Sequence, residues 1–248
     1  MKQGLRLVII RRRLVIYYGL FLTLAYLAGL ALWQERAIQA SVGSLAGKVV
    51  IIDPGHGGID PGAVGYNGVL EKDVVLSISK YLKNFLLQAG AMAIMTREVD
   101  MDLLDLFQQG KIKGELRDEL QMRVDVANEN HGDVFLSIHA NAHPSRWEYG
   151  AQAFYYPSSH PDNRRLAETI QAELKRLAGP TDREANFYID QYVLKRVKMP
   201  SATVEVGFLS NPTEEKMLAD PEYQQKMAWA IFVALARFFH RGAVPGPE

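Results

Sequence analysis

The chain has 248 residues, of which 48% are hydrophobic and 23% are charged, as in a globular protein with room for one sizeable domain plus extensions. Basic and acidic residues number 28 each, but the first 40 residues hold six basic residues and one acidic residue, which leaves a net charge of about −5 on the remainder. That remainder offers no basic face for nucleic acid, and the absence of cysteine excludes disulfides, thiolate metal sites and cysteine nucleophiles.

The chain begins with a basic stretch followed by an apolar one. Residues Leu14–Trp33 carry no charge, and three arginines, Arg11–Arg13, precede them. Twenty apolar residues span a bilayer as a helix, with the arginines on the cytoplasmic side. The alternative is a signal peptide cleaved near Ala40, although Ile38 fits the cleavage pattern poorly. We expect a retained membrane anchor, with secretion after cleavage as the second outcome, and in either case an exported remainder.

From Lys48 onward, short apolar runs alternate with helical periodicity, which is typical of an α/β domain. The predicted strands are Val49–Asp53, Ala91–Thr96, Val134–Ile138, Ala151–Tyr156, Tyr188–Leu194 and Thr203–Val206. The predicted helices are Val69–Gln88, Glu115–Asn130, Pro161–Ala178 and Pro221–His240. We therefore expect a single three-layer domain, with helices on both faces of a mostly parallel, twisted sheet of about six strands. The chain divides into a basic start (1–13), an anchor (14–33), a linker (34–47), this domain (48–241) and a tail (242–248).

A long loop, Asp100–Gly114, follows the second predicted strand. It holds four apolar residues close together, Leu103, Leu104, Leu106 and Phe107. These side chains either fold back on the domain or form a wall of a substrate groove or a docking patch for a regulatory partner protein.

Two predicted strands end in histidine. Ile51–Gly62 reads IIDPGHGGIDPG, with His56 among glycines that let other groups approach the backbone closely. His139 ends the run VFLSIHAN in the same way. Each histidine alone could be structural, in a turn or in a hydrogen-bonded core. Open α/β sheets, however, bind ligands beyond the carboxyl ends of their strands.

Two glutamates sit where the pattern predicts burial. Glu71 begins the apolar stripe of a predicted helix, and Glu205 lies among β-branched residues in ATVEVG. A first-turn glutamate is also favoured by the helix dipole, and a glutamate in a strand is ordinarily solvent-facing on an edge. Two histidines and one carboxylate form a recognised catalytic zinc set, and a second glutamate can act as the base.

The motifs DPGHGG, EKD, SIHANA and VEVGFLSNPTEE occur in this order between Lys48 and Phe239. Together they resemble the zinc-dependent N-acetylmuramoyl-L-alanine amidases of the bacterial cell wall. The resemblance implies one zinc ion per chain, bound by His56, Glu71 and His139, with Glu205 as the catalytic base. It also implies peptidoglycan as the substrate, hydrolysed at the amide between the muramoyl lactyl group and L-alanine.

Three further segments, LRDELQMRVDVANEN, SRWEYGAQAFYY and KMPSATVEVGFLSNP, look most like the germination-specific branch of that family in spore-forming bacteria. This branch implies a role in spore-cortex maturation, through formation of muramic lactam, and in germination. Nearness to His139 suggests Asn141 and Arg146 as substrate contacts. The alternatives are a zinc peptidase or deacetylase on the same polymer, and a catalytically inert, membrane-tethered wall-binding protein.

Overall fold

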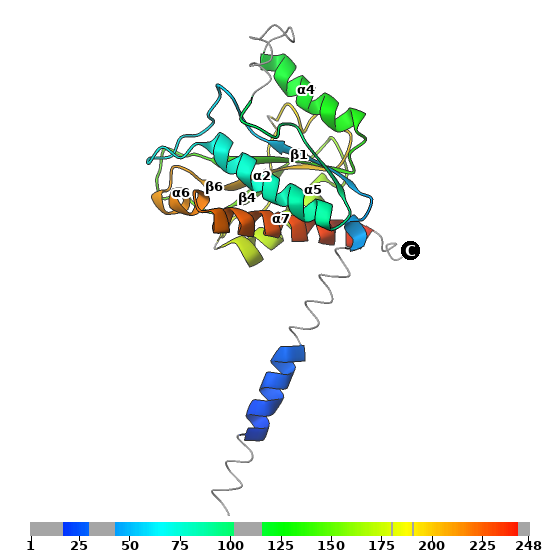
Figure 1. Cartoon of the computed structure of the whole chain (residues 1–248), viewed down its shortest axis with the longest axis vertical. Coiled ribbons are helices and arrows are strands. Elements are labelled where there is room, and N and C mark those ends of the chain that lie inside the picture. The colour runs from blue at the N-terminus through cyan, green and yellow to red at the C-terminus, as the bar shows by residue number, and fades with distance from the viewer. Residues whose placement is uncertain (1–16, 30–42, 102–115, 180, 190, 243–248) are drawn as a thin grey trace, which may run out of the picture. The chain divides into compact units, whose positions relative to one another are not determined.

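The computed structural model describes residues 17–29, 43–101, 116–179, 181–189 and 191–242 (Figure 1). The chain forms two compact units, residues 1–41 and 42–248. Residues 17–29 of the first unit form a helix, and the predicted membrane segment 14–33 extends at both ends outside the described residues. Within the described ranges, none of the helices has both the length and the apolar character needed to cross a membrane.

One six-stranded sheet runs through the described part of the second unit, in the order β2-β1-β3-β6-β4-β5. Its strands are β1 (Val49–Pro54), β2 (Met92–Met95), β3 (Val134–Asn141), β4 (Gln152–Tyr155), β5 (Asn186–Phe187) and β6 (Ser201–Phe208). Neighbouring strands are parallel except for β4, which runs antiparallel to β6. The predicted single α/β domain with a mostly parallel sheet is therefore confirmed.

Helices cover the sheet, and their bounds are α2 (Glu71–Gln88), α4 (Leu116–Glu129), α5 (Asn163–Glu173), α6 (Pro212–Leu218) and α7 (Pro221–Gly242). Helix α7 packs against α2 and α5, and these three form one apolar core with one face of the sheet (Figure 1). Helix α4 packs on the other face through Val124 and Ala127. Five further residues, Leu174–Ala178, extend α5 as a single π-helical turn.

The alternation of side chains along β1 shows how the two cores are divided. Val50 and Ile52 belong to the core beneath α2, α5 and α7, whereas Ile51 between them packs with Phe135 on the α4 face. Because both faces of β1 are covered and all three residues are fully buried, its sequence is apolar at each of these positions instead of alternating between apolar and polar residues.

The prediction of a strand at Tyr188–Leu194 is wrong. The strand in this region is β5, two residues long, and Tyr188 and Ile189 after it are exposed. Val193 and Leu194 are buried in turns against the α4 face, so their apolar character reflects packing rather than strand pairing. Helix α6 was not predicted, because seven residues are too few to show a helical period.

The packed domain begins before Lys48. Gly43–Leu45 forms a short 3-10 turn, η1, in which Leu45 is fully buried in the core. Ser44 donates a hydrogen bond from its hydroxyl to the carbonyl of Ala236 in α7 at 2.9 Å. The last residues of the segment expected to be a linker therefore belong to the domain.

Candidate active site

His56 lies in the loop that leaves the carboxyl end of β1. It adopts a left-handed backbone conformation, with φ of 59°, which is uncommon outside glycine. Its Nδ1 lies 2.6 Å from Oδ2 of Asp60, and its Nε2 lies 3.2 Å from Oε1 of Glu71. Burial would lower the pKa of His56, but the two carboxylates outweigh it and raise that pKa to about 9.

Glu71 is the first residue of α2, and its side chain is only 4% exposed. Its Oε1 also lies 2.9 Å from Nδ1 of His139 and accepts the backbone N–H of Ala140 at 2.9 Å. Its Oε2 accepts the backbone N–H of Ala63 at 2.8 Å. Burial would raise the pKa of Glu71, but hydrogen bonds from His139 and His56 hold it well below its usual range.

His56, Glu71 and His139 therefore lie together, although 68 residues separate the last two in sequence. Each offers one ligand atom, and these atoms all lie within 4.8 Å of one another. The two imidazole rings meet edge to face, with centroids 5.0 Å apart. Two imidazole nitrogens and one carboxylate oxygen are the donors that a catalytic zinc ion takes, so these side chains fit such an ion.

Glu205 lies on β6 directly opposite His139 on β3. Its Oε2 is buried and has no hydrogen-bond partner among the described residues. Burial raises the pKa of Glu205 to about 7, because the charge of His139 offsets only part of the desolvation. A carboxyl group with a pKa near neutrality and a free oxygen can both accept and return a proton.

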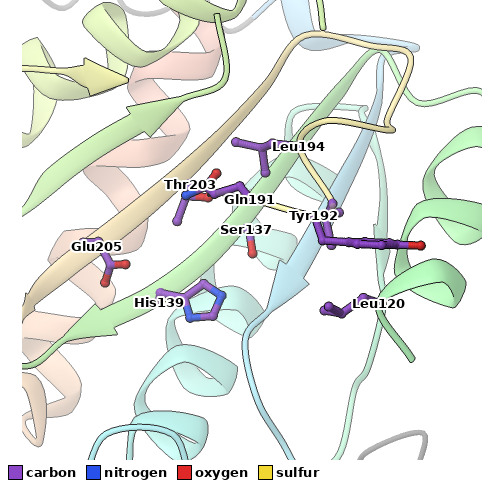
Figure 2. A pocket seen from close by; sticks show the side chains of 9 residues that line it. Leu120, Ser137, His139, Gln191, Tyr192, Leu194, Thr203 and Glu205 are labelled. Atoms are coloured by element: carbon purple, nitrogen blue, oxygen red, sulfur yellow. Dashed lines mark hydrogen bonds between the residues drawn. The ribbon is translucent and has the colours of Figure 1, made fainter. Parts of the chain in front are cut away.

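A cavity of about 240 Å³ opens between β3, β6 and the residues that precede β6. Figure 2 shows the carboxylate of Glu205 and the ring of His139 at one end of it, with Leu120 and Tyr192 at the other. Its remaining wall is formed by Ser137, Gln191, Val193, Leu194 and Thr203. The cavity therefore gives a small substrate group access to both site residues.

Sequence reasoning missed Asp60, the carboxylate that touches His56. Its contact fixes which nitrogen of the ring is turned toward Glu71, as outer carboxylates do for metal-ligating histidines. The signal was in the quoted motif, because Asp60 follows His56 by four residues in GHGGID. A loop that folds back through the Gly57–Asp60 bridge brings the two side chains together.

A buried polar network beneath the His56 loop was also missed. Asp53, 2% exposed, accepts hydrogen bonds from Thr96, Arg123 and Ser137 at 2.7, 2.7 and 2.8 Å. Burial would raise the pKa of Asp53, but Arg123 and these hydroxyl donors lower it. The hydrogen bond from Arg123 to Asp53 joins α4 to β1, although the two residues are 70 positions apart in the sequence.

Two guanidinium groups hold the backbone carbonyls of the His56 loop. Arg97 donates to the carbonyls of Pro54 and Gly55 at 3.1 and 2.8 Å. Arg123 donates to the carbonyls of Pro54 and His56 at 3.1 and 3.3 Å. These contacts stabilise the unusual turn that presents the His56 ring.

The two suggested substrate contacts lie beyond His139. Asn141 ends β3, and its carbonyl accepts the N–H of Leu209 at 2.8 Å. Arg146 lies outside the cavity of Glu205, with its guanidinium 4.5 Å from the ring centre of Tyr66. Arg146 lines a separate hollow instead.

Comparisons with known proteins identify the family to which the chain belongs. The sequence profile of the N-acetylmuramoyl-L-alanine amidase family matches residues 50–237. The chain is 42% identical over 204 residues to the germination-specific N-acetylmuramoyl-L-alanine amidase of Bacillus subtilis (strain 168). The aligned region covers 82% of this chain and 84% of that relative.

Solved structures show the same fold. The CwlD amidase of Clostridioides difficile, solved in complex with the GerS lipoprotein, superposes with a TM-score of 0.72 at 36% identity, covering 78% of this chain and 99% of that one. The catalytic domain of CwlV from Bacillus (Paenibacillus) polymyxa var. colistinus superposes with a TM-score of 0.68 at 31% identity, covering 78% and 98%. The chain belongs to the N-acetylmuramoyl-L-alanine amidase family and is an amidase that acts on peptidoglycan.

Proposed function

We propose that this amidase uses one zinc ion, held by His56, Glu71 and His139, and that Glu205 is its catalytic base. The observation that carries the proposal is the convergence of three ligand atoms beside a buried carboxyl oxygen without a partner among the described residues. When bound, zinc supplies Lewis acidity to a water molecule and to the carbonyl group of the substrate.

The bond cut is the amide between the lactyl carbonyl of N-acetylmuramic acid and the nitrogen of L-alanine. Glu205 accepts a proton from the attacking water at its free Oε2 and returns it to the departing nitrogen. The water oxygen stays on the lactyl carbon, so the products are a lactyl carboxylate and a peptide with a free L-alanine amino terminus. Asp60 and Ala140 keep His56 and Glu71 oriented throughout.

Metal analysis of the purified protein tests this assignment. One equivalent of zinc that is lost with a chelator, and activity that returns when zinc is added back, support it. A fully active protein without metal contradicts it. Because a peptidase or deacetylase could use the same ligands, the products must be identified in the same digest.

We place this activity in spore-cortex maturation, where removal of stem peptides precedes formation of muramic lactam, and in germination. The support is the likeness to the germination-specific amidase of Bacillus subtilis. Deletion of the gene in a spore-forming host should give cortex without muramic lactam, and normal cortex in such spores would contradict the role.

We also propose that the chain is exported and anchored, with its catalytic domain outside the cytoplasmic membrane. The support is the uncharged run Leu14–Trp33 behind three arginines. Protease added to intact protoplasts should remove the catalytic domain and leave a membrane-bound fragment. A domain protected from protease would contradict this location.

The loop Asp100–Gly114 is proposed as a docking site for a regulatory protein. Its apolar cluster, Leu103 to Phe107, supports this, as does the lipoprotein complex of the relative CwlD. Residues 102–115 lie outside the described residues. Changing Leu104 and Phe107 together to serine should lower activity on polymeric wall while zinc content and thermal stability stay unchanged. If thermal stability fell in proportion to activity, the result would indicate that these side chains pack in the core of the domain and do not form a docking site.

A further inference from the structure

The loop of residues 142–151 is fixed at both ends to the candidate active site. It begins after Asn141, two residues beyond His139, and it ends at β4, where Gln152 pairs with Glu205. Side chains from the segment after β6 hold it: Glu214 accepts the N–H of Gly150 at 3.0 Å. Both ends of the loop therefore lie next to residues of the candidate active site.

The loop presents a tryptophan to solvent. Trp147 is 88% exposed, although indole is among the largest apolar groups and gains most from burial. Tyr66, 72% exposed, lies in the segment that leads to Glu71. The stacking of Arg146 on Tyr66 joins the two segments that carry Glu71 and His139. Exposed aromatic side chains on a fixed surface next to an active site are typical of a binding site.

Trp147 and Arg146 line a hollow of about 680 Å³, larger than the cavity of Glu205. Its other lining residues are Pro144, Ser145, Asn211, Pro212 and Thr213. Among these described lining residues there is one cation and no carboxylate. The surface thus combines an indole face with hydroxyl, amide and guanidinium donors.

This combination fits a sugar polymer that carries carboxylates. The C–H faces of pyranose rings pack on indole, and their hydroxyl and N-acetyl groups exchange hydrogen bonds with amides and hydroxyls. A guanidinium pairs with lactyl or peptide carboxylates. A hollow of this volume beside the smaller cavity has room for sugars of a chain that continues past the reacting bond.

We propose that the hollow formed by Arg146, Trp147 and Asn211 binds the glycan strand of peptidoglycan, at sugars next to the muramoyl residue whose amide is cut. The proposal rests on the proposed function, because it needs the muramoyl group at Glu205. Binding at sugars remote from the reacting bond stabilises substrate and transition state alike, so it lowers KM and leaves kcat unchanged.

The kinetic test compares two substrates, polymeric peptidoglycan and a single N-acetylmuramoyl dipeptide. Trp147→Ala should lower kcat/KM on the polymer by roughly 10-fold through KM, the usual effect of removing an aromatic anchor. On the single-sugar substrate the variant should match the wild type. Trp147→Phe should recover most of the loss. The matched control is Phe187→Ala, which removes an aromatic that is 57% exposed and lines neither hollow.

A binding measurement separates this proposal from the proposed function. Glycan strands stripped of all stem peptides contain no scissile amide, so their retention does not depend on hydrolysis or zinc. The wild-type protein should retain them, and Trp147→Ala should not. Equal losses on both kinetic substrates, no loss on the polymer, or equal binding of stripped strands by the two proteins would overturn the proposal. So would Trp147-dependent binding to anionic lipid vesicles in place of glycan, which would assign the surface to the membrane.

Discussion

His139 and Glu205 are register partners on the adjacent parallel strands β3 and β6. In a parallel sheet, paired residues direct their side chains to the same face, so the proposed zinc ligand His139 and the proposed base Glu205 lie next to each other. Both belong to the face that α4 covers, while Ile138 and Val204 beside them fill the opposite core. The register of β3 and β6 thus places these two side chains side by side.

Loss of one histidine should abolish the metal site. We expect His139→Ala to remain folded and to lose stoichiometric zinc, because two ligands hold the ion far more weakly than three. Zinc content by mass spectrometry and circular dichroism of the same sample check this. The assignment fails if both His56→Ala and His139→Ala proteins keep one equivalent of zinc. His160→Ala, at a histidine outside the site, is the control.

Replacement of the proposed base should separate metal binding from turnover. Glu205→Gln keeps the size of the side chain but cannot accept the proton, so activity should fall by about 10² to 10⁴ with zinc retained. Turnover and zinc content are measured on one preparation. If this variant loses its zinc, Glu205 is a ligand rather than the base.

Zinc uptake should release protons and strengthen with pH. In the metal-free fold, the pKa of His56 is raised to about 9, so the ring is protonated at neutral pH and must lose its proton to bind zinc. The same shift stabilises the metal-free fold fully below the unfolded pKa of 6.5, and this stabilisation is lost as the pH rises through 9. Calorimetry in buffers of different ionisation enthalpy measures the released protons. An affinity that does not change between pH 6 and about 9 would contradict this reading.

Removal of Arg123 should destabilise the domain strongly. Arg123→Met leaves Asp53 and Glu119, 2% and 6% exposed, without their partner, and breaking such a buried pair costs about 3–5 kcal/mol. Urea unfolding measures the loss, which Asp53→Asn in the same protein should partly reverse. The matched control is Arg164→Ala, in an exposed pair with Glu168, which should cost less than about 1 kcal/mol. Similar losses of unfolding free energy in Arg123→Met and Arg164→Ala would mean that burial of the ion pair does not determine how much its removal destabilises the domain.

Part of the site could be predicted from the sequence because parallel sheets bind ligands beyond the carboxyl ends of their strands. His56 and His139 each follow an apolar run, and strand ends in a parallel sheet meet at one edge. The partners Asp60 and Arg123 could not be found in this way. Their contacts depend on the fold of a glycine-rich turn and on a helix 70 residues away, which leave no period in the sequence.

The failed strand prediction at Tyr188–Leu194 has a similar cause. Tyr192, Val193 and Leu194 pack in turns against the α4 face, and all three line the cavity of Glu205. Short apolar runs do not distinguish a strand from a packed turn, because both bury the same side chains.

The most direct test of the proposed chemistry is digestion of purified peptidoglycan by the zinc-loaded protein in heavy-oxygen water, followed by mass spectrometry of both products. If water attacks the lactyl carbonyl, the heavy oxygen appears in the muramoyl lactyl carboxylate, and the released peptide carries an unlabelled chain with a free L-alanine amino terminus. Label within the stem peptide would identify a peptidase, and labelled acetate would identify a deacetylase. Either result would contradict the assignment of Glu205 and its neighbours to the muramoyl–L-alanine bond.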